Sequence, residues 1–260
     1  MFRCLSRSIA SLAALCVFGC LTPPHPYAIA PGQEGANGAK AFLLLPLNLV
    51  VALPAELERP SRRVSQLTAD YLADCGKDVS SLGLYSARDF WRGAVRDAEQ
   101  SEDAEQTFDA AAPLFVRRIR ESQPFDALVM PSLVYRTARI AQGSRFVAWD
   151  GVKRELETVN EPHNVGGFIV MVDPAGEMPA VSLHVFVFDA EGERIFESYG
   201  GLDLVHKFDF SSAPKVIRKD HLDMPLKSRR LDDEAALREG IAVTFEPYLT
   251  PPPEAGAEEH

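Results

Sequence analysis

Asp203 and His206 are the two side chains whose types and spacing come nearest to a catalytic or metal-binding pair. A carboxylate beside an imidazole could activate a water molecule or share a metal ion. Zinc sites usually take ligands from close pairs of Cys, His or carboxylate residues, and His163, His184 and His221 are too widely spaced to supply them. Motifs for nucleophile elbows, zinc proteases, phosphate loops and dinucleotide folds are also missing. We therefore expect no catalytic residue, no cofactor and no metal, and hence no enzyme.

Cys20 ends a segment that is typical of a secretory signal. Basic residues precede an apolar run over residues 9–18, and this run is too short to span a bilayer. The sequence Val17-Phe18-Gly19-Cys20 resembles the lipobox of bacterial lipoproteins, in which the Cys is acylated, with palmitate among the expected chains, and the bond before it is cleaved. Because Leu21 rather than Asp follows, the resemblance implies a lipid anchor on the periplasmic face of the outer membrane. Plain secretion, by cleavage after Ala30, is the alternative.

A basic segment between positions 206 and 231 contrasts with the net charge of −10 of the whole chain. Long connections without evident secondary structure are often functional or disordered. We expect a partner surface there for an envelope protein, an anionic polymer or lipid head groups, with a solvated connection as the alternative. The candidate contact residues are Lys215, Arg218, Lys219, Lys227, Arg229 and Arg230. The acidic composition argues against nucleic-acid binding, which needs concentrated Lys and Arg.

The periodicity of apolar residues predicts helices first and strands later. Expected helices cover residues 61–79, with Ser61 as the cap, 86–95, and 104–120, which Pro113 should kink or split. A last helix is expected from a cap at Asp232 or Asp233 to about Glu246. Expected strands cover residues 42–53, 83–85, 127–136, 145–149, 168–172, 181–188 and 194–199. Asp150-Gly151 favours a hairpin turn. This order predicts one α/β (α+β) domain, in which amphipathic helices pack on a mixed, mostly antiparallel sheet.

Composition predicts the domain limits. A signal peptide is expected at 1–19, the lipidated Cys and a flexible linker at 20–40, the α/β domain at 41–249 and a disordered acidic tail at 250–260. After processing, Cys75 would have no disulfide partner, and we interpret it as a small buried hydrophobe.

Several phrases within this order carry a family resemblance. They are the apolar strand with Pro46, Ser86-Ala87-Arg88-Asp89-Phe90, Phe125-Asp126-Ala127-Leu128-Val129 and Phe188-Asp189-Ala190-Glu191-Gly192. Over residues 41–249 the chain resembles the α/β domain of TolB amino-terminal domains, CsgG-like curli secretion lipoproteins and LpoB-like activators. The resemblance implies a binding or assembly module of the bacterial envelope. The alternatives are an envelope hydrolase around Asp203 and His206, or a subunit of a ring-forming secretion or motility apparatus.

Overall fold

The structure is a computed structural model, and it describes residues 24–33, 38–53, 55–100, 107–140, 146–159, 176–209, 226–227 and 230–251. Its elements in chain order are β1 (Tyr27–Ile29), β2 (Ala41–Leu44), the 3₁₀ helix η2 (Ala55–Leu57), α1 (Glu58–Asp74), β3 (Asp78–Ser81), α2 (Leu84–Glu99), α3 (Thr107–Ser122), β4 (Ala127–Ile140), β5 (Phe146–Trp149), β6 (Val152–Glu155), β7 (Thr158–Val159), β8 (Gly176–Asp189), β9 (Arg194–Leu204), β10 (Phe208–Asp209) and α4 (Glu234–Phe245).

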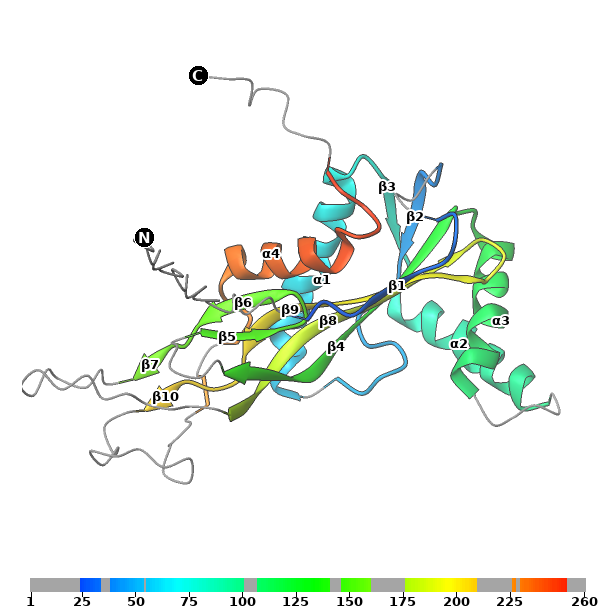
Figure 1. Cartoon of the computed structure of the whole chain (residues 1–260). Coiled ribbons are helices and arrows are strands. Elements are labelled where there is room, and N and C mark those ends of the chain that lie inside the picture. The colour runs from blue at the N-terminus through cyan, green and yellow to red at the C-terminus, as the bar shows by residue number, and fades with distance from the viewer. Residues whose placement is uncertain are drawn as a thin grey trace, which may run out of the picture.

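A mixed sheet in the order β1-β9-β8-β4-β2-β3 forms the centre of the molecule (Figure 1). The long strands β4 and β8 pair antiparallel along their whole length, and β9 pairs antiparallel with β8. The strands β2 and β3 add a parallel part to the sheet beside the start of β4. This arrangement confirms the predicted fold class, a single mixed α/β domain.

Helices cover both faces of this sheet. Alternate residues of β8, such as Val181 and Val185, join the core cluster that includes Leu67 of α1 and Ile241 of α4. The opposite face, with Phe188, packs on α2 and α3. Successive side chains of a strand point to opposite faces, so a strand with apolar residues in both registers needs two layers of helix. A third apolar cluster lies under the β5–β6 hairpin.

Glycines bring α4 onto β9. A side chain at Gly240 would collide with the carbonyl group of Gly201, and one at Gly200 would collide with the helix backbone. The predicted hairpin turn is also confirmed, because Asp150 and Gly151 both have positive φ angles, of 35° and 80°, between β5 and β6. Positive φ at both central residues is what a tight hairpin turn requires.

The first third of the chain differs from the sequence prediction. The strand expected over 42–53 ends at Leu44, and a loop without regular structure follows it. The helix α1 begins before Ser61, whose hydroxyl donates to the carbonyl of Glu58 over 2.6 Å instead of capping the helix. It ends before Gly76, whose φ of 75° turns the chain so that Val79 lies in β3.

Three further elements also differ. The strand expected over 83–85 is the start of α2, with Gly83 as the extended N-cap residue. The helix α3 continues through Pro113 as one element instead of splitting there. Part of the expected linker, β1, pairs with β9 at the edge of the sheet, so the folded domain includes residues before 41. The strand expected over 168–172 lies outside the described residues.

Candidate functional site

The residue predicted to carry lipid and most of the predicted basic surface lie outside the described residues. Cys20 belongs to this group, as do Lys215, Arg218, Lys219 and Arg229. His163 and His221 lie outside as well. Lipidation and the contact role of these side chains therefore stay predictions, and the described part of the basic segment is limited to Lys227 and Arg230.

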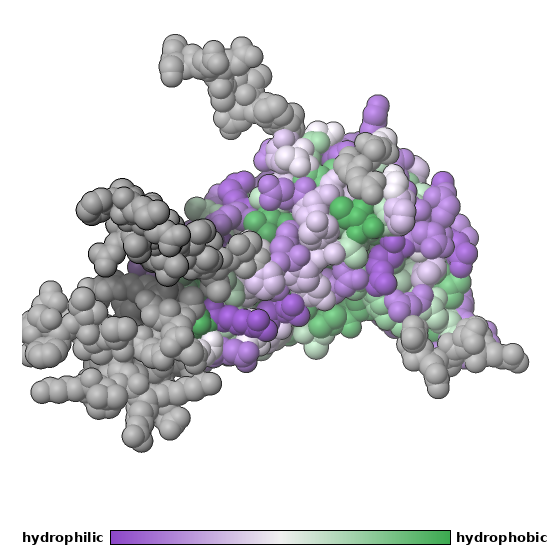
Figure 2. Space-filling model, in the orientation of Figure 1, coloured by the Kyte–Doolittle hydropathy of each residue, from purple (hydrophilic) through white to green (hydrophobic). Residues whose placement is uncertain are grey.

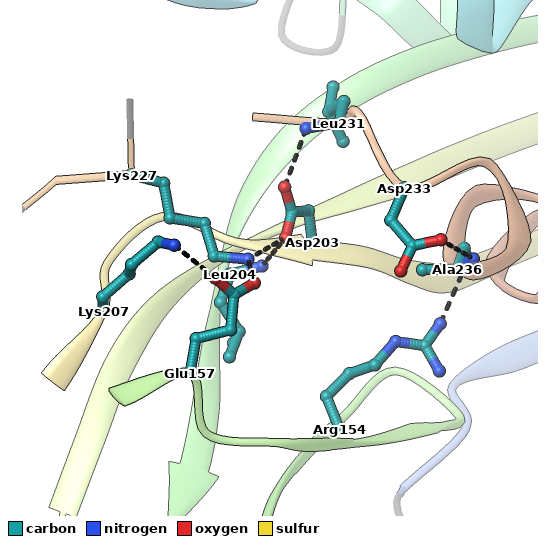
Figure 3. A network of polar contacts seen from close by, with 9 residues as sticks. All are labelled: Arg154, Glu157, Asp203, Leu204, Lys207, Lys227, Leu231, Asp233 and Ala236. Atoms are coloured by element: carbon teal, nitrogen blue, oxygen red, sulfur yellow. Dashed lines mark hydrogen bonds and ion pairs between the residues drawn. The ribbon is translucent and has the colours of Figure 1, made fainter. Parts of the chain in front are cut away.

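Lys227 is buried in an ion-pair network instead of lying on an open surface (Figure 3). Its side chain is 8% exposed, and its ammonium lies 2.7 Å from Oδ1 of Asp203 and also contacts Glu157. Glu157 pairs in addition with Lys207 at 2.8 Å. Burial opposes the charged form of Lys227, but the hydrogen bonds to the two carboxylates outweigh it and raise its pKa. The positive charge of Lys227 is therefore used inside the fold.

Both carboxylate oxygens of Asp203 accept hydrogen bonds. Its Oδ1 also accepts from the amide of Leu204 at 2.8 Å, and its Oδ2 accepts from the amide of Leu231 at 2.7 Å. These bonds tie the segment before α4 to the end of β9, and we call the Asp203–Lys227–Glu157 network the latch. His206 does not bind Asp203, and its Nδ1 is buried without a hydrogen-bond partner. The geometry does not assemble the pair that would support a hydrolase.

Arg230 is likewise a structural residue. Its side chain is 11% exposed and lies 3.5 Å from the carboxylate of Glu56, which accepts a 2.5 Å hydrogen bond from the Tyr135 hydroxyl. The hydrogen bond from Tyr135 is the largest cause of a lowered pKa of Glu56. Both described members of the predicted basic surface therefore fasten the chain to the domain.

A buried carboxylate on the β5–β6 turn also serves the fold. Asp150 accepts two bonds from the Arg136 guanidinium, at 2.9 and 3.1 Å, and a third from the Ser182 hydroxyl at 2.7 Å. Trp149 beside it is 1% exposed and belongs to the core. Because these bonds occupy both oxygens of Asp150, the residue holds the hairpin against β4 and β8 and is not placed for acid or base chemistry.

Cys75 is free and half-buried. Burial is the largest cause of the raised pKa of its thiol. A raised pKa keeps the sulfur in the less reactive thiol form, which agrees with its interpretation as a small hydrophobe.

A groove of about 600 Å³ lies between the loop that follows β2 and the first turns of α1 and α2. One wall is the apolar loop Pro46–Leu53. The other wall consists of α1 side chains at helical spacing, namely Glu58, Ser61, Arg62 and Ser65, together with Leu84 and Arg88 from α2. The hydrophobic surface along the lower edge of Figure 2 coincides with the position of this loop in Figure 1. The volume of the groove is within the range typical of ligand sites.

The groove exposes groups that could bind a partner. Val51 is 44% exposed at the loop tip, and Tyr85 beside the groove is 83% exposed. Within the described part of the chain, the main chain of residues 50–53 makes no hydrogen bond to another main-chain group, whereas Leu49 closes the turn at residues 47–48. Arg62 and Arg88 likewise form no ion pair with any described residue. The groove thus combines apolar contact area with unused donors, acceptors and positive charge.

Asn48 fixes this loop in place. It adopts a φ of 55°, and its side chain binds both main-chain groups of Leu133, as donor at 3.0 Å and as acceptor at 2.8 Å. The amide thereby occupies the position of a neighbouring strand residue, and the loop leaves the sheet. Sequence reasoning missed the groove because it assigned these apolar residues to a buried strand. The one available signal was Pro46, which disfavours a central strand.

The described residues offer neither a metal site nor a membrane-spanning helix. They contain no group of three or more His, Cys, Asp or Glu side chains that could hold a metal ion. No helix among them is long and apolar enough to cross a membrane.

The comparisons with known proteins do not identify a family. No family model and no curated protein matches the chain. Among solved structures, a PelC dodecamer from Paraburkholderia phytofirmans matches 87% of this chain and 99% of its own, with 8% identity and a TM-score of 0.38. A likeness at this level supports no inference about fold or function. The resemblance to TolB, CsgG-like and LpoB-like domains therefore stays a prediction.

Proposed function

We propose that this chain is a lipid-anchored binding or assembly module on the periplasmic face of the bacterial outer membrane. The lipobox-like sequence around Cys20 supports the anchor and its location. The single structural observation that carries the binding role is the groove between the 46–53 loop and the helices, where apolar surface, free main-chain groups and two unpaired arginines meet.

The geometry around the candidate catalytic residues supports a binding role over an enzymatic one. Asp203 is held by one ammonium and two amides, and Asp150 by a guanidinium and a hydroxyl. These bonds give both carboxylates structural roles, which supports a binding module over a hydrolase built on Asp203 and His206. The ring-forming alternative is tested by measuring the size of the protein in detergent, because this size distinguishes a ring from a monomer.

The anchor is tested by replacing Cys20. Cells that express the full chain are grown with a labelled fatty acid, and their membranes are separated. The parent protein should carry label and fractionate with the outer membrane, whereas Cys20→Ser should be unlabelled and unprocessed or soluble. Label that remains on Cys20→Ser would refute lipidation at this residue.

The binding role is tested by photo-crosslinking in the same cells. A photoreactive residue at Val51 lies at the groove, and one at Ala73, exposed on the last turn of α1, is the matched control. Defined adducts should form from position 51 and not from position 73, and replacing Arg62 and Arg88 together should remove them. Equal adducts from both positions would mean that the groove is not the contact site.

A further inference from the structure

We infer that the occupant of the groove is an extended polypeptide segment of a partner protein, with an acidic side chain beside apolar ones. This inference rests on the proposed binding function and names the chemistry of its ligand. Three features of the groove carry it: the free main-chain groups, the two arginines without an ion-pair partner and the apolar contact area.

The free main-chain groups favour a peptide over an acyl chain. Residues 50–53 present N–H and C=O groups that pair with no main-chain group of the described residues. Covering such groups with hydrocarbon would leave them unpaired, at a cost of about 1–3 kcal/mol each. An extended peptide instead supplies its own N–H and C=O groups, as in strand addition to a sheet edge. A ligand that buries this loop is therefore expected to contain peptide bonds.

The helix wall carries more positive than negative charge, because Arg62 and Arg88 line it beside one carboxylate, Glu58, and this balance favours an acidic ligand. Arg62 and Arg88 line the groove without an ion-pair partner among the described residues, although the protein as a whole carries a net charge of −10. Two neighbouring arginines do have partners, since Arg63 pairs with Glu234 and Arg92 with Asp89, whereas Arg59 in the first turn of α1 has none among the described residues. A guanidinium that is left free beside apolar surface matches a carboxylate, which it can bind with two parallel hydrogen bonds.

Apolar residues on both walls of the groove determine which ligand side chains can lie next to that carboxylate. Val51 and Leu84 are both more than a third exposed at the groove. Covering exposed apolar area of this kind is favourable by about 25 cal/mol per Å². Apolar ligand side chains would lie on these two residues, while the acidic one reaches the arginines. The loop does not need to reorganise, because Asn48 already holds it to β4.

The experiment selects ligands without assuming their sequence. A displayed library of random linear peptides is panned against the full chain solubilised in detergent. Selected peptides should share an Asp or Glu flanked by apolar residues. Changing both groove arginines, as Arg62→Glu with Arg88→Glu, should weaken their binding about tenfold or more, the equivalent of about 1.4 kcal/mol. Arg96→Glu, which removes the same charge from an exposed position of α2 outside the groove, should leave binding unchanged.

Two further arms make the result specific. Peptides in which the acidic residue is replaced by Lys should bind the doubly substituted protein better than the parent, since the charges are then exchanged. N-methylation of the central peptide bonds should abolish binding if main-chain groups pair with residues 50–53. Thermal melting of each variant confirms that the domain is folded.

Several outcomes would overturn the inference. A library that yields no acidic and apolar sequence, or one whose peptides bind the doubly substituted protein equally well, rules out this ligand class. Binding of the parent to phosphatidylglycerol vesicles that depends on both arginines, with no peptide enriched, would assign the groove to a lipid surface. If crosslinks at position 51 persist in any of these cases, the proposed binding function stands and only the ligand class is wrong.

Discussion

Asp203→Asn is expected to release the latch that holds the segment before α4. The carboxylate accepts from Lys227 and Leu204 through one oxygen and from Leu231 through the other. Asparagine has the same shape but keeps only one acceptor, so its amide group must face at least one of these donors. The substitution therefore removes charge and leaves a buried donor unpaired, without creating a cavity.

The magnitude follows from the same contacts. A hydrogen bond to a charged group contributes about 1.5–3 kcal/mol, and an unsatisfied buried donor costs about 1–3 kcal/mol. Removing one partner of a buried ion pair costs about 3–5 kcal/mol, but Glu157 still neutralises Lys227 in the variant. We therefore expect a loss of about 2–4 kcal/mol in the free energy of unfolding. This is a large fraction of the roughly 5–15 kcal/mol that stabilises a typical domain.

The pH of the measurement follows from the pKa shifts in the latch. The pKa of Lys227 is raised from 10.5, so its contribution is present below that pH and is lost as pH rises through the folded-state value. The pKa of Glu157 is lowered from 4.5: burial opposes the shift, but the bonds from Lys207 and Lys227 outweigh it. Its contribution is present above 4.5 and is lost as pH falls. Both contributions are complete at neutral pH.

The assay is urea unfolding at neutral pH, followed by the fluorescence of the buried Trp149. Asp233→Asn is the matched control, because Asp233 only caps α4 through the amide of Ala236, and Asn caps a helix about as well as Asp. The midpoint should fall for Asp203→Asn with an unchanged slope, and should hardly move for the control. Equal midpoints for the two variants would refute the role assigned to the latch.

Two other substitutions test the core and the partly buried imidazole of His184. Leu67→Asp should lower the free energy of unfolding by several kcal/mol, because Leu67 is 5% exposed and a carboxylate there has no partner. The control Ala73→Asp, on the exposed side of α1, should cost about 1 kcal/mol or less. Equal melting temperatures for the two variants would show that the helix face of Leu67 is not core. Burial lowers the pKa of His184 from 6.5 although Glu197 raises it, so the unfolded chain binds the extra proton more readily and stability should fall as pH drops below 6.5. His184→Phe should reduce this slope in thermal melts between about pH 7 and 5, and an unchanged slope would contradict the assignment.

Local signals in the sequence predict the β5–β6 turn and the start of α4. The Asp150-Gly151 pair predicts the β5–β6 turn because two residues with positive φ suffice to reverse the chain. The two aspartates Asp232 and Asp233 predict the start of α4, and the structure shows that Asp233 is the cap, because its side chain accepts from the amide of Ala236. In each case the interaction that decides the structure spans only a few residues, so it can be read from neighbours in the chain.

The described end of the basic segment differs from the sequence prediction because its charged residues pair with carboxylates that are distant in the chain. The positive charges near the end of the segment suggested an exposed surface, but the partners of Lys227 are Asp203 and Glu157, and the partner of Arg230 is Glu56. These carboxylates lie on separate elements, and nothing in the local sequence indicates that they meet the segment. The described lysine and arginine are therefore structural, while the contact role of the other four residues stays a prediction.

The apolar loop shows how one polar residue can decide the use of many apolar ones. By composition alone, residues 42–53 favour a strand that is covered on both faces. In the fold, Asn48 places its side-chain amide against Leu133, where a continued strand would have paired, and its main-chain N–H donates to the carbonyl of Pro131 at 3.1 Å. Because the side chain satisfies β4 in place of main chain, the main-chain groups of residues 49–53 are released from the sheet. The Asn48 side chain therefore ends the strand, and it also leaves the main-chain groups of the loop wall of the groove without partners in the sheet.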